Sequence, residues 1–342
     1  MRIRTLLAAS LGLTALALVP TKTTQAQAEF VAAFGSAAPE GTPWADLLVK
    51  LKDEVKTKTG GRVQIKTFLG SVLGGEVEMI RDVRRNSRLQ GGGFSTGALA
   101  EGANVPLLQI TELPYLFANT NQVDCVLDNV LMDPMRQQLA DKGFHLAFWS
   151  ENGWRNFATK EVAARTPDQL DGVKMRSQES DVHTMMYSAL GANAVTLPIS
   201  EVLTGLQTGI VDGFDNSPLF TQAAGLHEPI NYYIISKHIY QPAAIVWSKT
   251  FWDALPPDIQ ADITEVSTPL AAEGRVNVRA MNDALVGNFP SLGVEVVELT
   301  DAERQVFATK TKSVHLEYAK TVTGGTDLLK TVNTALKSQC AL

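Results

Sequence analysis

The 342-residue sequence has little of what metal, redox or nucleotide chemistry requires. It contains two cysteines and five histidines, and no histidine falls in an HExxH motif or another spacing typical of a metal site. It has no GxxxxGK[ST] phosphate loop and no GxGxxG dinucleotide loop. Its 30 basic and 36 acidic residues give a net charge of −6, which argues against a nucleic-acid surface. We therefore expect no cofactor, no bound metal and no nucleic-acid partner.

Long apolar runs are also lacking after the first 28 residues, so no later stretch has the roughly 20 uncharged residues that a membrane span needs. The N-terminus differs, because Arg2 and Arg4 precede an apolar run over residues 6–19. That run is short for a span, and Ala26-Gln27-Ala28 fits the small-x-small cleavage rule. We predict a cleaved secretory signal over residues 1–28 and an exported mature protein, with an uncleaved anchor as the alternative.

The two cysteines are Cys125 and Cys340. In an oxidising compartment they could pair and tie the C-terminus to the middle of the chain. They could equally be two unrelated buried thiols, and the sequence leaves both possibilities open.

Hydrophobic periodicity indicates alternating strands and helices. Trp44, Leu47, Leu48, Leu51 and Val55 recur with helical spacing, between strands expected over residues 29–34 and 62–68. The same alternation recurs between residues 144 and 214, with strands expected over 144–150, 154–159, 173–176, 194–197 and 210–214. Such alternation predicts parallel βαβ units, and thus an α/β fold with one block before about residue 150 and one after it.

The chain is expected to cross between the two blocks near Asn152-Gly153 and again near Gln241-Pro242. A long helical segment begins after Pro256-Pro257, and Pro269 is expected to kink or break it. A strand over residues 294–299 and a helical region over 301–337 follow.

One short motif points to hydrolysis. Gly93-Phe94-Ser95-Thr96-Gly97 matches the GxSxG nucleophile elbow, and Asp212 and His227 follow in the chain order of a triad. The residues after the motif form a short stretch bounded by glycine and proline, where that elbow requires a long helix. A secreted serine hydrolase using Ser95 is therefore only a weak alternative.

A set of seven segments in a fixed order carries a stronger signal. They are Leu73-Gly74-Gly75-Glu76, Leu113-Pro114-Tyr115-Leu116-Phe117, Gly153-Trp154-Arg155-Asn156, Lys174-Met175-Arg176, Leu190-Gly191-Ala192, residues 197–202, and residues 206–218. Together they resemble the DctP-type solute-binding proteins of TRAP (tripartite ATP-independent periplasmic) transporters, across nearly the whole mature chain.

The resemblance implies a two-lobed periplasmic binding protein that is not an enzyme. Each lobe would be a mostly parallel sheet flanked by helices, with long C-terminal helices bridging the lobes. Lobe I would comprise residues 29–152 and 242–281, and lobe II residues 153–241 and 282–342 with the C-terminal helices.

The implied function is capture of an organic acid anion in the periplasm. The ligand would pass to membrane subunits of the small DctQ type and the large DctM type, and the binding protein would be a monomer. A binding protein that feeds a sensor is the alternative.

The expected ligand contacts in lobe II begin with Arg176, which matches the family's carboxylate-clamping arginine. A carboxylate removed from water needs a fixed cation with paired donors, and arginine supplies that planar fork. Arg155 matches the family's second arginine. Asn216 matches the asparagine of a Gln-Glu-Asn-Pro-like motif, although Phe214-Asp215 replaces Gln-Glu and Ser217 precedes Pro218.

Four further residues complete the expected site. Ser95 and Thr96 fall where the third strand's end would face the cleft, and Phe34 ends the first strand and could line the same mouth. Ile199 stands where relatives often place an aromatic ring. Asp212 is expected to cap a turn, and the absence of the Trp-x-Gly-Pro-like segment that marks one metal-binding subfamily supports the prediction of no metal.

Overall fold

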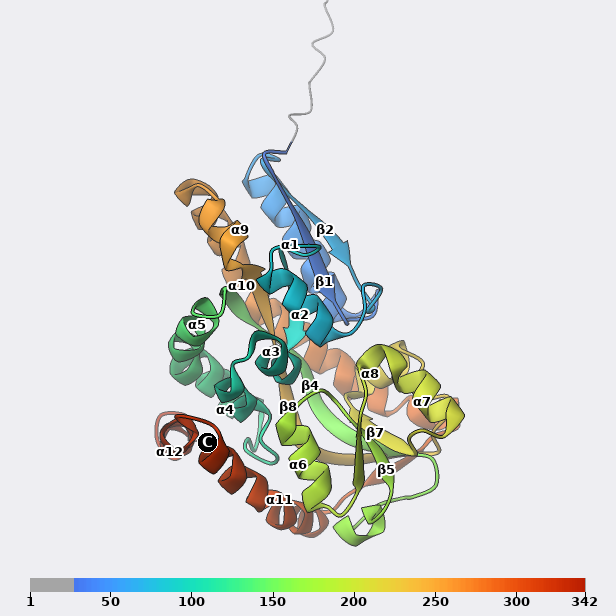
Figure 1. Ribbon diagram of the computed structural model, residues 1–342. Helices are drawn as coiled ribbons and strands as arrows, with labels where there is room; N and C mark the ends of the chain where they lie inside the picture. Colours follow the sequence, from blue (N-terminus) through green and yellow to red (C-terminus); the bar gives the residue numbers. More distant parts are fainter. Residues whose placement is uncertain (1–27, 342) are drawn as a thin grey trace, which may run out of the picture.

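The computed structural model describes residues 28–341, so the predicted signal segment lies outside the described residues except for Ala28. The molecule is built on a long twisted sheet with helices on both faces (Figure 1). No helix within this described span is long and apolar enough to traverse a bilayer.

The first third of the fold follows the predicted alternation. It comprises β1 (Phe30–Ser36), α1 (Pro43–Lys58), β2 (Val63–Phe68), α2 (Glu76–Arg84) and β3 (Gly91–Ser95), and β1 runs parallel to both β2 and β3. The Thr42 hydroxyl accepts a hydrogen bond from the Ala45 amide and so caps α1. The helix then buries the five apolar side chains whose spacing predicted it.

Short helices connect this region to the next strand. They are α3 (Thr96–Ala103), η1 (Pro106–Glu112), α4 (Thr120–Val126), η2 (Leu127–Leu131) and α5 (Met132–Ala140).

Two long strands, β4 (Phe144–Thr159) and β8 (Tyr232–Ser248), run antiparallel through the middle of the sheet. The strands expected over 144–150 and 154–159 are thus one strand, which the sequence divides because its register shifts between Glu151 and Gly153. Gly153 has a φ of 95°, a left-handed conformation that glycine adopts without strain. Gly153 pairs with Gln241, so the two predicted crossing points lie opposite each other.

The chain between the long strands forms the other end of the sheet. It contains η3 (Pro167–Leu170), β5 (Lys174–Ser177), α6 (Asp181–Ala189), β6 (Asn193–Thr196), η4 (Ile199–Glu201), α7 (Val202–Thr208), β7 (Gly213–Asn216) and α8 (Pro218–Ala223). The strand order is β2-β1-β3-β8-β4-β7-β5-β6, and β9 (Glu295–Glu298) pairs with β8.

The C-terminal third supplies most of the long helices. It comprises α9 (Lys249–Ala254), α10 (Pro257–Val286), η5 (Phe289–Leu292), α11 (Asp301–Thr321) and α12 (Gly325–Leu336). Of the kink or break predicted at Pro269, the break is wrong, because α10 continues through this residue and packs along its length against α1, β4 and α8, while the kink stays a prediction. The α12 helix returns to α4 and η1, although residues 282–342 were assigned to lobe II.

The structure decides between the two possibilities for the cysteines. Cys125 and Cys340 form a disulfide with their Cα atoms 5.6 Å apart, which fixes the end of the chain beside α4.

The two apolar cores lie on opposite faces of the sheet. One contains side chains of α2 to α6, α11 and α12, and the other contains side chains of α1 and α7 to α10. Because both cores extend past the crossing points, the two ends of the sheet share their packing.

Candidate functional site

Arg176 is a buried cation without a carboxylate partner. It lies near the end of β5 with 3% of its surface exposed, and its Nε donates to the Leu197 carbonyl at 2.9 Å. Across residues 28–341 its guanidinium makes no other hydrogen bond and no ion pair. Burial, with a contribution from nearby Arg155, lowers the pKa of Arg176 to about 10. Its two terminal nitrogens therefore have no acceptor in the described part of the chain.

Arg155, in β4, is equally buried, and each of its three guanidinium nitrogens donates to a protein acceptor. Its Nε donates to Asp215 Oδ2, its Nη2 donates to the Asp215 carbonyl, and its Nη1 donates to Gln241 Oε1 at 2.7 Å. Burial alone would lower the pKa of Arg155, but Asp215 holds it above its usual value. The arrangement is that of a bracing ion pair, and ligand contact by Arg155 stays a prediction.

Asp215 is the centre of this bracing cluster. Its carboxylate also accepts from the Tyr187 hydroxyl at 2.6 Å and lies 3.2 Å from His238 Nε2. Burial would raise the pKa of Asp215, but Arg155 and His238 hold it well below its usual range. Burial lowers the pKa of His238. Asp215 therefore stays ionised and His238 stays neutral, which suits the buried ion pair of Asp215 with Arg155.

Asn216 ends β7 directly beside this cluster. Its Oδ1 accepts from Asn152 Nδ2 at 2.7 Å and from the Ser217 amide at 2.9 Å, while its Nδ2 donates to nothing in the described part of the chain. The inserted Ser217 caps α8 by accepting from the Phe220 amide, and it also donates to Asn152 Oδ1. The departure from the family motif therefore fixes the asparagine and leaves one of its donors available.

Ser95 lies at the end of β3 and is held by Glu76 at the start of α2. The Ser95 amide and hydroxyl donate to the two Glu76 carboxylate oxygens at 2.8 and 2.9 Å. Burial raises the pKa of Glu76, while Ser95 and Arg176 act in the opposite direction. This carboxylate faces the same region as Arg176.

The other predicted contacts lie deeper or to the side. Thr96 is fully buried, and its hydroxyl donates to Glu112 Oε1 at 2.7 Å. Phe34 is not at a cleft mouth as predicted, because it is fully buried with its ring edge-to-face on Trp247 at 4.5 Å. Ile199 begins η4 and packs half-buried against the core. Whether any of the seven predicted residues touches a ligand stays a prediction.

A second buried carboxylate, Glu112 at the end of η1, collects donors from separate parts of the chain. Its oxygens accept from the Gly97 amide, Gln178 Nε2 at 2.9 Å and Gln241 Nε2 at 3.0 Å, and His183 Nε2 lies 2.7 Å away. Burial would raise the pKa of Glu112, but His183 and Thr96 hold it below its usual value.

Sequence reasoning gave no role to five of these residues: Glu76, Glu112, Gln178, His183 and His238. The first stood inside a motif segment, which was a usable signal. The two histidines looked like isolated residues, since nothing in the spacing of a lone histidine reveals a buried carboxylate from another element.

The structure does not assemble the hydrolase alternative. Ser95 is bonded to Glu76, and Asp212 forms an ion pair with Lys174 at 3.5 Å, so the expected side-chain cap on the turn is replaced by that pair. Between residues 28 and 341 no group of three His, Cys, Asp or Glu side chains could hold a metal ion, and the absence of a metal stays a prediction.

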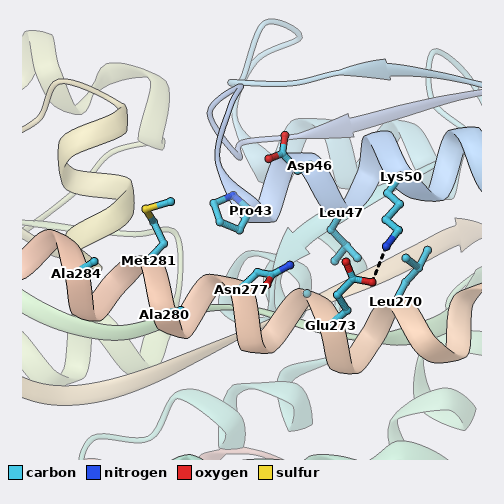
Figure 2. A pocket seen from close by; sticks show the side chains of 11 residues that line it. Pro43, Asp46, Leu47, Lys50, Leu270, Glu273, Asn277, Ala280, Met281 and Ala284 are labelled. Atoms are coloured by element: carbon cyan, nitrogen blue, oxygen red, sulfur yellow. Dashed lines mark hydrogen bonds and ion pairs between the residues drawn. The ribbon is translucent and has the colours of Figure 1, made fainter.

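A separate surface groove of about 420 Å³ lies between α1 and α10. It is bordered by the Lys50–Glu273 ion pair and by Met281 (Figure 2). None of the predicted site residues lines it, so it is distinct from the candidate site.

Known proteins match the chain over most of its length. Residues 34–321 match the family model described as bacterial extracellular solute-binding protein, family 7. The 2,3-diketo-L-gulonate-binding periplasmic protein of Escherichia coli K12 is 29% identical over 83% of this chain and 85% of its own length. The C4-dicarboxylate-binding periplasmic protein of Rhodobacter capsulatus is 29% identical over 93% of this chain and 95% of its own.

Solved structures show the same fold. A TRAP periplasmic solute-binding protein from Sulfitobacter sp. NAS-14.1 with bound β-D-galacturonate superposes with a TM-score of 0.85 and 25% identity. The match covers 89% of this chain and all of the other. The resemblance and the α/β binding-protein fold are therefore confirmed, and these relatives are substrate-binding proteins, which confirms the prediction that the chain is not an enzyme.

Proposed function

Because the chain belongs to the bacterial extracellular solute-binding protein family 7, we propose that it captures an organic acid by binding the ligand carboxylate to Arg176. The observation that carries the proposal is the unpaired charge of this buried arginine. A buried cation is costly unless an anion joins it, and a carboxylate can accept two parallel bonds from the free end of a guanidinium. Asn216 Nδ2 offers a further donor from the neighbouring β7.

The acid that fits best is a monocarboxylate rich in hydroxyl groups, such as a sugar acid. Asp215, Glu179 and Glu76 are the carboxylates whose charges bear on Arg176, and burial raises the pKa of Glu179 and Glu76. A second carboxylate on the ligand would be repelled by them, whereas hydroxyl groups can donate to Glu76. The galacturonate and diketogulonate named for two relatives are acids of this kind.

Binding would close two lobes about the centre of the long strands. The lobes are residues 29–152 with 242–281, and residues 153–241 with 282–342, and their crossings lie opposite each other at the Gly153–Gln241 pair. The third boundary between the lobes, after residue 281, falls inside α10, which contacts both α1 and α8. Hinge closure of this type buries the ligand between lobes.

The closed protein would then deliver the acid to DctQ-type and DctM-type membrane subunits, after export to the periplasm by the N-terminal signal. The family supports this setting. We propose a monomer as the binding form.

The proposal is tested by thermal shift of residues 29–342 against D-galacturonate, D-gluconate and succinate. A ligand at 100 times its Kd stabilises the folded state by about 2.7 kcal/mol. We expect the two sugar acids to raise the Tm and succinate to leave it unchanged, and Glu76→Gln to reduce that discrimination. A Tm raised by succinate alone would overturn the proposed ligand class, and native mass spectrometry showing no organic acid bound under any condition would overturn the function.

A further inference from the structure

We propose that Glu112 is a positioning residue that holds the two lobes together and so sets the fraction of protein that is closed before a ligand arrives. This inference rests on the proposed function, because it presupposes lobes that close. We call Glu112, Gln178 and His183 the clasp.

The clasp joins groups on the two sides of the proposed cleft. On the lobe I side, Glu112 Oε1 accepts from the Thr96 hydroxyl and the Gly97 amide, both at the start of α3. On the lobe II side, Glu112 Oε2 accepts from Gln178 Nε2 at 2.9 Å and pairs with His183 Nε2 at 2.7 Å. Opening the cleft would separate one set of partners from the other.

His183 depends on this contact more than Glu112 does. The ring is fully buried in α6, and its Nδ1 makes no hydrogen bond in the described structure, lying 3.9 Å from Asp215 Oδ2. The contact with Glu112 is therefore the one hydrogen bond that the described residues give this ring. In an open form, Glu112 would keep its lobe I donors, while His183 would have to find water.

The geometry of Gly97 shows how closely the two sides meet. A Cβ atom at this position would lie 2.1 Å from Gln178 Nε2 and 2.9 Å from Glu112 Oε2. Gly97 is in α3, and alanine is favourable in a helix. The steric clash of an added methyl group therefore comes from the side chains of Gln178 and Glu112. A methyl group here would act as a wedge on the closed form.

The clasp acts on closure and not on ligand selection, because both Glu112 oxygens are occupied by protein donors. When only one conformation binds, the apparent Kd equals the intrinsic Kd divided by the competent fraction. Weakening the clasp should therefore weaken every ligand by the same factor.

The experiment compares the wild type with Glu112→Gln and Gly97→Ala. Small-angle scattering of the ligand-free proteins gives the radius of gyration, and calorimetry gives the Kd for D-galacturonate and D-gluconate. Asp82→Asn is the matched control, since Asp82 is a buried carboxylate whose partners, Arg85 and Arg88, are on its own lobe. We expect Glu112→Gln and Gly97→Ala to increase the radius of gyration of the ligand-free protein, or to raise the Kd of both acids by one common factor of about ten, equivalent to ~1.4 kcal/mol. The control should change neither.

Two results would overturn the clasp. One is an unequal loss of the two affinities in Glu112→Gln, which would make Glu112 a ligand contact. The other is an unchanged radius of gyration together with unchanged Kd values in both variants. If neither acid binds the wild type, the proposed ligand class fails, and an unchanged radius of gyration in both ligand-free variants then overturns the clasp by itself.

Discussion

Arg155 in β4 and Arg176 in β5 are equally buried in one sheet with β7 between their strands, yet only Arg155 has a carboxylate against it. Arg155 forms an ion pair with Asp215, whereas the guanidinium of Arg176 forms no ion pair within the described chain. A protein gains nothing in stability from such an isolated charge. A buried, unpaired arginine is explained if a ligand anion completes the ion pair. By this criterion Arg155 braces the protein and Arg176 binds the ligand.

Replacing Arg176 with methionine should abolish binding and leave the ligand-free protein at least as stable. Two charge-assisted hydrogen bonds, at ~1.5–3 kcal/mol each, correspond to at least a 100-fold loss of affinity. Burial and the nearby Arg155 lower the pKa of Arg176 to about 10, so the charged side chain destabilises the ligand-free protein and the variant removes that cost. Calorimetric titration and the ligand-free Tm measure the two effects.

Arg176→Lys is the control for that experiment. It keeps the charge but not the planar fork, so we expect intermediate affinity. A methionine variant that lowers the ligand-free Tm by many degrees would show that Arg176 is structural.

Asp215→Asn should have the opposite profile, with a large loss of stability. Removing one partner of a buried ion pair leaves Arg155 uncompensated and typically costs about 3–5 kcal/mol. Urea unfolding of the ligand-free protein measures this cost. If Arg155 instead bound the ligand and Asp215 only oriented it, the free energy of unfolding would change little while affinity fell.

The ligand-free protein should lose stability as the pH falls below about 6.5. The folded pKa of His238 is lowered from 6.5, so protonation begins to favour the unfolded chain there. The folded pKa values of Glu112 and Asp215 are also lowered, so their stabilisation is complete above their ordinary values of 4.5 and 3.8 and disappears as the pH falls toward the folded values. Burial raises the pKa of Glu76, Glu151 and Glu179, so these groups oppose the trend as they take up protons, whereas His145, whose pKa burial lowers to about 4, adds to it.

Thermal melts between pH 8 and pH 4 test the sign. His238→Gln should reduce the part of the decline that begins near pH 6.5, to which buried His145 and His315 also contribute, and should leave the acid limb. A Tm that rises on acidification from pH 7 to pH 5 would contradict the charge states assigned to this cluster.

Reduction of the Cys125–Cys340 disulfide should lower stability without changing ligand affinity. The bond closes a loop spanning 215 positions, and loss of a disulfide typically costs about 2–5 kcal/mol. It joins α4 to the end of the chain, and neither cysteine contacts the candidate site residues. Tm and Kd measured with and without a reductant, beside a Cys125→Ser/Cys340→Ser variant, check this; a weaker Kd in the double variant would tie the C-terminus to binding.

The sequence predicted individual helices and strands better than it predicted where one element continues into the next. Helix α1 could be predicted because its five apolar side chains and Thr42 cap are local signals. The unity of β4 could not, because its bulge at Gly153 resembles a turn when the partner strand is unknown. Likewise, Pro269 signals a helix end locally, but packing of α10 against three other elements outweighs one lost backbone hydrogen bond.

The candidate site shows the same difference between local and long-range signals. Arg176 and Asn216 were identifiable because they stand in ordered motif segments. The pairing of Arg155 with Asp215 and the cluster around Glu112 arise from residues between 15 and 129 positions apart, and no sequence spacing indicates them. Phe34 was misplaced because a strand end can finish in the core as readily as at a cleft.

Gly75 offers a test of lobe closure that is independent of charge. Its backbone angles, φ −67° and ψ 159°, suit any residue, so alanine brings no strain of its own. A Cβ atom here would lie 3.0 Å from Pro198 Cβ and 3.8 Å from Glu179 Oε2, both of which belong to lobe II.

Because the proline ring cannot rotate away, the methyl group added by Gly75→Ala should destabilise the closed form and leave the open form unaffected. Crowding of this kind typically costs about 1–3 kcal/mol, which corresponds to a loss of affinity of about 5- to 150-fold at an unchanged ligand-free Tm. Gly287→Ala is the control, since it has a similar φ and only the Ala284 carbonyl, at 3.9 Å, nearby. Equal Kd values for the Gly75→Ala and Gly287→Ala proteins would mean that ligand binding does not bring these two surfaces together, and the division of the chain into closing lobes would have to be redrawn.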